Sequence, residues 1–283
     1  MKSPLRYPGG KSRAIKLIKE YIPSDIKKLA SPFLGGGSLE LYYASRGVEV
    51  AAYDLFTPLC WFWKALLTDP QSLANKSDSH RDYGGYASKQ MTNLRGLSKP
   101  NFLKLRDLLA DQKEYSLASA AIFYALNRSS FSGETLSGGY SRQAAYTRFT
   151  DSSIKRIRDF KVDRFSVQNK AFEESIAENQ DAFLYCDPPY LLETGNNLYG
   201  KSGDMHKSFD HEKLCEMLKQ RTDWVLSYND SEQIRKMYAG YEIIPLSWSY
   251  GMKNVSSIKT GGSKKKKKMG KSSEILITSG EQK

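Results

Sequence analysis

Residues that bind metals or form disulfides are scarce in this chain of 283 residues. The three cysteines, Cys60, Cys186 and Cys215, are far apart and form no C-x-x-C pair, and the three histidines have no metal-binding spacing. We therefore expect neither a disulfide framework nor a metal site. The chain also begins without a signal-peptide core and contains no apolar run of about 18 residues. These absences predict a soluble, cytoplasmic protein that does not associate with membranes.

Acidic residues are fewer than basic ones, with 31 Asp and Glu against 43 Lys and Arg, which gives a net charge of +12. Such an excess predicts a polyanionic partner. Residues 250–273 hold eight lysines and no acidic residue, so the rest of the chain carries 12 − 8 = +4. The run Lys264–Lys268 within this segment is typical of a solvated loop. Alternatively, it adds sequence-independent attraction to phosphates.

The order of apolar segments and glycines predicts an α/β fold. Residues 28–34 are mostly apolar and lead into the glycines at 35–37, and a helix and a second strand ending at Asp54 follow. This order is typical of a doubly wound nucleotide-binding sheet. Residues 57–150 interrupt it with helical stretches and a long polar loop. We therefore predict an α/β domain from residues 1–56 and 151–283, with residues 57–150 forming an inserted, mainly helical lobe.

The stretch LRYPGGKSR at residues 5–13 looks at first like a triphosphate-binding loop. That motif requires a glycine five positions before Gly10, where this chain has Leu5. Too few residues precede it for a buried strand. An NTPase is therefore disfavoured, and the role of the glycine turn depends on motifs elsewhere in the chain.

The stretch LYCDPPY at residues 184–190 carries the strongest chemical signal. Asp187 follows a buried strand, which is where open α/β sheets bind ligands. The two prolines leave carbonyls without local amide partners, so Asp187 and the Pro188 carbonyl offer two acceptors beside the ring of Tyr190. Two acceptors and a flat ring suit an exocyclic amino group on an aromatic base. Asp54 suits ribose hydroxyls, or alternatively it caps the helix that follows.

Taken in order, LRYPGGKSR, SPFLGGGSLEL, YD and LYCDPPY resemble the Dam-type DNA adenine-N6 methyltransferases. The resemblance implies a Rossmann-like methyltransferase sheet with an inserted DNA-recognition lobe. It also implies methyl transfer from S-adenosylmethionine to the N6 amine of an adenine flipped out of a specific duplex DNA sequence, in a bacterial or phage-infected cell. The sequence leaves the oligomeric state open, and a monomer is plausible. Cytosine-N4 methylation and a catalytically silent DNA-binding relative remain alternatives.

The resemblance also assigns residues to roles. The catalytic residues would be Asp187, Pro188 and Tyr190. Cofactor binding would involve Tyr7, Lys11, Phe33, Gly35, Gly37, Asp54, Phe172 and Asp187. Contacts with DNA would come from a recognition hairpin within residues 125–143, through Asn127, Arg128, Phe131 and Arg142. That hairpin is longer and richer in glycine than the family's pattern, so the target sequence stays open, although GATC is the family's commonest site.

Cytosine-C5 methylation is disfavoured by the cysteines. That reaction needs a cysteine nucleophile, typically in a Pro-Cys pair, whereas the cysteines here follow Leu59, Tyr185 and Leu214. Cys186 precedes Asp187 but alternates away from it along the strand, and we expect it in the core. Asn229, at the end of a later strand, is expected to close the pocket.

Overall fold

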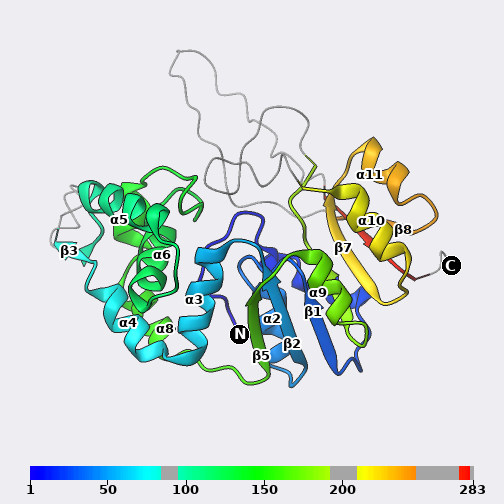
Figure 1. Ribbon diagram of the computed structural model, residues 1–283, viewed down its shortest axis with the longest axis horizontal. Helices are drawn as coiled ribbons and strands as arrows, with labels where there is room; N and C mark the ends of the chain where they lie inside the picture. Colours follow the sequence, from blue (N-terminus) through cyan, green and yellow to red (C-terminus); the bar gives the residue numbers. More distant parts are fainter. Residues whose placement is uncertain (84–94, 192–208, 247–273, 281–283) are drawn as a thin grey trace, which may run out of the picture.

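A seven-stranded, mostly parallel sheet forms the centre of the protein. The computed structural model describes residues 1–83, 95–191, 209–246 and 274–280 (Figure 1). The strands of the sheet are β1 (Lys28–Ser31), β2 (Glu49–Asp54), β5 (Phe165–Asn169), β6 (Phe183–Cys186), β7 (Trp224–Asn229), β8 (Glu242–Leu246) and β9 (Glu274–Thr278). Their order is β5-β2-β1-β6-β7-β9-β8. The first five are parallel, and β9 runs antiparallel to both of its neighbours.

Helices α1 to α11 also occur within the described residues. They are α1 (Ile15–Ile18), α2 (Ser38–Ala44), α3 (Thr57–Thr68), α4 (Pro70–Asp78), α5 (Lys99–Asp111), α6 (Leu117–Ser129), α7 (Arg142–Thr147), α8 (Asp151–Arg158), α9 (Phe172–Glu178), α10 (His211–Lys219) and α11 (Glu232–Met237). Two short 3-10 turns cover Lys11–Arg13 and Lys19–Tyr21, and β3 (Asp82–Tyr83) pairs with β4 (Arg95–Gly96).

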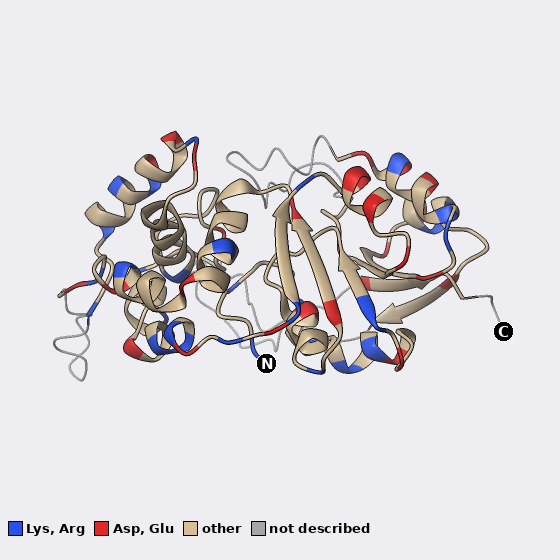
Figure 2. Ribbon diagram, turned by 60° about the horizontal axis from the view of Figure 1, so that its bottom comes forward, with Lys and Arg blue, Asp and Glu red and all other residues tan. Residues whose placement is uncertain are grey.

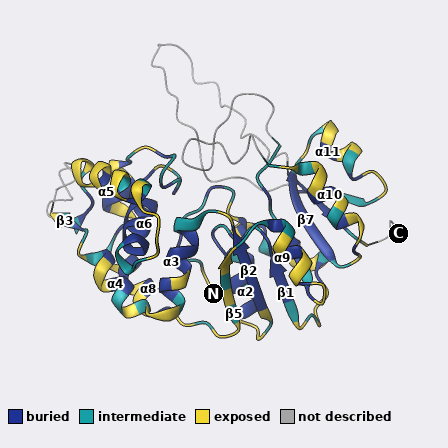
Figure 3. Cartoon of the chain, in the orientation of Figure 1, coloured by how far each residue is buried: buried dark blue, intermediate teal, exposed yellow. Residues whose placement is uncertain are grey.

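Helices cover both faces of the sheet, and alternation along the strands shows why. In β6, Tyr185 packs into one core with α1 and α2, whereas Leu184 and Cys186 pack into a second core with α9, α10 and α11. Both sets are buried, as expected for a parallel sheet covered on its two faces. Figure 3 shows the same contrast, with buried strands between helices whose outer surfaces are exposed. The expected burial of Cys186 is confirmed, and the fold is the α/β, Rossmann-like sheet that the sequence predicted.

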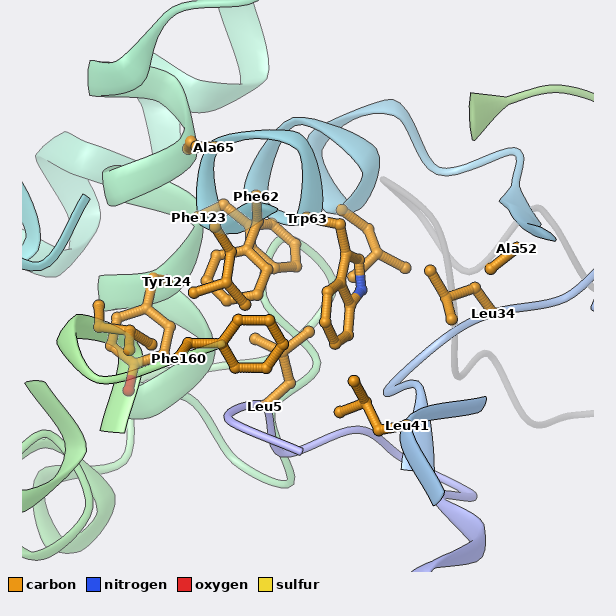
Figure 4. Close-up of a cluster of buried hydrophobic side chains, with 14 of the residues drawn as sticks. Leu5, Leu34, Leu41, Ala52, Phe62, Trp63, Ala65, Phe123, Tyr124 and Phe160 are labelled. Carbon is orange, nitrogen blue, oxygen red and sulfur yellow. The ribbon is translucent and has the colours of Figure 1, made fainter. Parts of the chain in front are cut away.

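Helices α3 to α8 lie beside the β5 edge of the sheet (Figure 1). Phe62 and Trp63 of α3 pack with Phe123 of α6 in the same apolar cluster as Leu5 and Leu41 (Figure 4). The helices therefore share a core with the sheet. Helix α8 packs against α4, although the sequence pattern places residues 151–158 in the α/β domain. The division at residues 56 and 150 stays a prediction.

Charged residues are mixed over the outer helices, and the strands carry few of them (Figure 2). None of the helices in the described ranges is long and apolar enough to cross a membrane. The lysine run Lys264–Lys268 lies outside the described residues.

Candidate active site

A cavity of about 700 Å³ opens at the carboxyl ends of β1, β2 and β6. Its wall combines the glycine turn after β1, Asp54 at the end of β2 and residues 187–190 after β6. The amino-terminal residues 7–11 and the lobe residues 132–135 complete it. Parallel strands end at the same edge of the sheet, so segments that are far apart in sequence meet at one ligand-sized hollow.

The glycine turn leaves room for side chains of the protein itself, in addition to any ligand. A Cβ at Gly35 or Gly36 would come within 2.9 or 2.8 Å of the Tyr7 side chain, and one at Gly37 within 2.8 Å of Trp63. Gly37 also has φ +65°, a left-handed conformation that favours glycine. The sequence pattern suggests that these glycines admit a ligand to the backbone. All three glycines line the cavity, and their missing side chains also make room for Tyr7 and Trp63.

Asp54 is 8 % exposed and holds the turn together. One carboxylate oxygen accepts from the Gly35 amide at 2.9 Å, and the other accepts from the Phe56 amide at 2.9 Å. Asp54 lines the cavity, as the ribose role requires. It also braces the segment before α3 through the Phe56 amide, but it does not cap the helix, whose N-cap Phe56 has no side-chain cap hydrogen bond. Burial raises the pKa of Asp54 to about 6, and the hydrogen bonds from the two amides oppose this rise.

Asp187 forms a partly buried ion pair with Lys11. The Lys11 ammonium donates to the two carboxylate oxygens at 2.7 and 2.9 Å and to the Gly9 carbonyl at 2.9 Å. Lys11 is 5 % exposed. Burial raises the pKa of Asp187, and the charge and hydrogen bonds of Lys11 oppose that rise. Lys11 therefore sits at the strand end, in direct contact with the carboxylate of the Asp-Pro-Pro-Tyr motif.

Aromatic rings line two parts of the cavity. The ring of Tyr190 stacks on that of Tyr228, with ring centroids 6.0 Å apart. The Lys11 ammonium lies 5.1 Å from the centroid of the Tyr190 ring. On another side, Phe33 and Phe172 pack 5.8 Å apart and both contact Phe209. The second group supplies an apolar wall on which a purine could stack.

Asn229 lies at the end of β7. Its side-chain amide donates to the Leu191 carbonyl at 2.8 Å, which anchors the segment just after Tyr190. It is absent from the described lining of the cavity, and its role in closing the pocket stays a prediction.

The lobe approaches the cavity through a reversal of the chain between α6 and α7. Ser130 bridges Tyr140 in antiparallel fashion, and the Ser141 amide donates to the Ser129 carbonyl at 2.9 Å. Ser132, Gly133 and Thr135 have φ values of +53°, +85° and +56°. This conformation suits glycine but is costly at Ser132 and Thr135, and such strained residues often occur at functional sites.

Of the four residues expected to contact DNA, two are buried and two are exposed. Asn127 is fully buried. Its side chain accepts a hydrogen bond from the Arg6 amide and donates to the carbonyls of Arg6 and Gly133. Arg128 is 7 % exposed and donates to the Arg148 carbonyl at 2.9 and 2.7 Å. These contacts give both residues a structural role, and burial keeps them from base edges in this structure. Phe131 and Arg142 are exposed, so the geometry favours them as DNA contacts.

Two acidic residues of the cavity were assigned no role from the sequence, although Glu40 lies within the SPFLGGGSLEL motif. Glu40 on α2 is 2 % exposed and accepts from the Ser31 hydroxyl at 2.7 Å, and burial raises its pKa to about 7. Glu274, the first residue of β9, is 6 % exposed and lies 4.0 Å from the Lys11 ammonium. The Glu40 position just after the glycine turn was a usable signal. No sequence signal marked Glu274, because its strand follows a long lysine-rich segment and the pattern does not show which strand pairs with β7.

The cavity is acidic although the protein is basic. Its described lining contains two lysines, Lys11 and Lys170, and seven acidic residues. The acidic residues are Glu40, Asp54, Glu134, Glu173, Asp187, Asp210 and Glu274. Such a surface favours a ligand that carries positive charge.

The doubly wound sheet, with a glycine turn, a strand-end acid and Asp-Pro-Pro-Tyr around one cavity, is a Rossmann-like methyltransferase fold. The chain belongs to the D12 class N6 adenine-specific DNA methyltransferase family, whose model matches residues 7–252. It is similar to Type II methyltransferase M2.HphI of Haemophilus parahaemolyticus, at 25 % identity over 80 % of this chain and 83 % of that protein. A DNA adenine methylase of Vibrio cholerae is 25 % identical over 84 % and 85 % of the two chains.

A third relative is Type II methyltransferase M.CviBI of Paramecium bursaria Chlorella virus NC1A, at 22 % identity over 85 % of this chain and 88 % of that protein. Membership of the family makes this chain an adenine-specific DNA methyltransferase. The expectation drawn from the sequence motifs is confirmed at that level.

Proposed function

We propose that the protein transfers the methyl group of S-adenosylmethionine to the N6 amine of an adenine flipped out of a specific sequence of duplex DNA. One observation carries the proposal most directly. Asp187 and Pro188 line the same cavity as the glycine turn and Asp54. Acceptors for an amine and acceptors for a nucleoside ribose thus lie within reach of one another.

The cavity fits this cofactor in charge and in chemistry. The cofactor carries a sulfonium, an ammonium and a carboxylate, which suits an acidic wall that contains the cation of Lys11. Asp54 would accept from the ribose hydroxyls, Phe33 and Phe172 would pack on the adenine, and Tyr7 would contact the methionine end. When bound, S-adenosylmethionine supplies an electrophilic methyl group. Ligand hollows of this size commonly combine apolar walls with few polar anchors.

The protein's own contribution lies in how it would hold the target amine. The lone pair of adenine N6 is delocalised into the ring. Hydrogen bonds from the amine to Asp187 and to the Pro188 carbonyl would concentrate electron density on nitrogen and orient its lone pair. The raised pKa of Asp187 makes it a better proton acceptor than an exposed carboxylate. No covalent intermediate with the protein is needed.

A stacked base cannot reach this cavity, so the adenine must leave the duplex. Tyr190 would replace part of the lost stacking energy, and Tyr228 holds its ring in place. Phe131, which is 61 % exposed, would wedge into the duplex. Arg142 would contact a phosphate or a guanine edge.

Modified-base sequencing tests this function directly. The wild-type gene and an Asp187→Asn variant are expressed in cells without adenine methylation, and their DNA is sequenced for N6-methyladenine and N4-methylcytosine. We expect N6-methyladenine at one sequence motif for the wild type and none for the variant. N4-methylcytosine would establish the cytosine alternative. An unmodified genome from folded wild-type protein that binds DNA would establish the silent relative.

A further inference from the structure

Lys11 lies between two carboxylates next to different strands, the partly buried Asp187 and the buried Glu274. Asp187 follows β6 and Glu274 begins β9, with β7 between these strands in the sheet. The Lys11 ammonium is 2.7 Å from the nearer oxygen of Asp187 and 4.0 Å from that of Glu274. The side chains of Lys11 and Glu274 are 4 % and 6 % exposed, so water screens their attraction weakly.

The hydrogen bonds of Lys11 are fully committed in this arrangement. An ammonium has three N–H donors. They point to the Gly9 carbonyl and to the two oxygens of Asp187, at 2.9, 2.7 and 2.9 Å. Glu274, at 4.0 Å, interacts with Lys11 through charge and lies beyond hydrogen-bonding distance of it. A small rotation of the Lys11 side chain would exchange one Asp187 contact for Glu274.

Such an exchange matters because the proposed reaction needs an Asp187 oxygen. A target amine must donate to that carboxylate while the carboxylate remains electron-rich. With both oxygens bound by the same ammonium, part of that electron density is drawn towards Lys11. A second carboxylate near Lys11 lets the cation turn away without leaving its charge unpaired in a buried site, which would be costly.

We propose that Glu274 is a positioning residue of this site, which takes over one donor of Lys11 when the target amine binds Asp187. The proposal rests on the proposed function. Glu274 touches neither the amine nor the methyl group; it acts through Lys11. The other polar or charged groups near Asp187 are Glu40, Tyr185 and Tyr190. Glu40 is bonded to Ser31, Tyr185 lies near Ser227, and Tyr190 hydrogen-bonds to Asp187 itself, so none of the three takes this role.

The first test compares Glu274→Gln with Glu242→Gln. Glu242 lies on the neighbouring strand β8, in register with Thr278 at the far end of β9, and serves as a matched control. We expect Glu274→Gln to lower kcat about tenfold and to change KM for DNA and cofactor less than twofold. The acid limb of kcat against pH should move to lower pH, because Asp187 then faces Lys11 without a competing carboxylate. Glu242→Gln should match the wild type.

The second test is a double-mutant cycle measured by single-turnover methylation. In a Lys11→Met background no cation remains to be shared, so adding Glu274→Gln should have no further effect on the rate. Multiplied effects of the two changes, or an unmoved pH profile, would overturn the role of Glu274. Should Glu274→Gln fail to fold, Glu274→Asp, which keeps the charge but shortens its reach, should lower kcat two- to threefold. A wild-type rate of zero would instead contradict the proposed function.

Discussion

Two of the sequence motifs that were assigned a function, the segment at 184–190 and the hairpin within 125–143, lie in different surroundings in the structure. The side chains of Asp187 and Tyr190 line the cavity, whereas Asn127 and Arg128 turn into the protein and bind backbone carbonyls. The difference follows from where each motif lies. Residues after parallel strands converge on one exposed edge of the sheet. Polar residues at the end of α6 lie where the lobe meets the amino-terminal segment, and there they satisfy buried backbone groups.

The largest effect should come from the strand-end motif. Asp187→Ala removes the acceptor that orients the amine, and loss of a single group of this kind typically costs about 10²–10³ in kcat. DNA binding should remain within a few fold of wild type in a mobility-shift titration. Retained methylation in this variant would contradict the proposed chemistry.

A second pair of variants separates the two kinds of lobe residue. Asn127→Ala removes bonds to Arg6 and Gly133 and should lower the free energy of unfolding by about 3 kcal/mol. Arg142→Ala changes an exposed residue, so stability should move by less than about 0.5 kcal/mol. Arg142→Ala should nevertheless weaken DNA binding several fold. Denaturant unfolding and DNA titration of both proteins measure the contrast, and a reversed pattern would contradict the distinction drawn here.

The acidic wall of the cavity predicts a dependence of cofactor affinity on pH. The pKa values of Asp54 and Glu40 are raised by burial to about 6 and about 7, so both carboxyls are ionised at pH 8 and take up protons as pH falls. Fewer negative charges then face a cationic ligand. Calorimetric affinity for S-adenosylmethionine should fall roughly tenfold between pH 8 and pH 5.5. Glu40→Gln should flatten the upper half of that curve; a curve identical to wild type would exclude Glu40 from this effect.

The smallest effect concerns the basic segment rather than the cavity. Deleting Lys264 to Lys268 should reduce the slope of log affinity for DNA against log salt, by about 0.9 for each phosphate that these lysines neutralise. Cofactor affinity should not change, because that ligand binds the acidic wall. A salt slope equal to that of the full chain would show that these lysines do not bind phosphates.

Sequence alone predicted the strands that carry the motifs and the core position of Cys186. Short sequence patterns, namely alternating apolar residues and acidic residues at strand ends, are enough to predict these features. The pairing of β9 between β7 and β8 was not predictable in this way, because its partner strands lie before a long lysine-rich segment. The hydrogen bonds of Lys11 to Asp187 span 176 positions in sequence, so no local pattern encodes them. Similarly, the packing of Tyr7 against the glycine turn depends on the tertiary fold.

The place of β9 in the sheet also affects how the protein is made. Within the described part of the sheet, β8 is joined to the other strands through β9, which follows both β7 and β8 in the sequence. A ribosome-bound chain that ends before residue 274 therefore presents β7 as an unpaired edge and leaves β8 unattached. Synthesis of β9 then completes the described sheet and brings Glu274 to Lys11 in the same step, so one strand both joins β8 to the sheet and supplies the second carboxylate near Lys11.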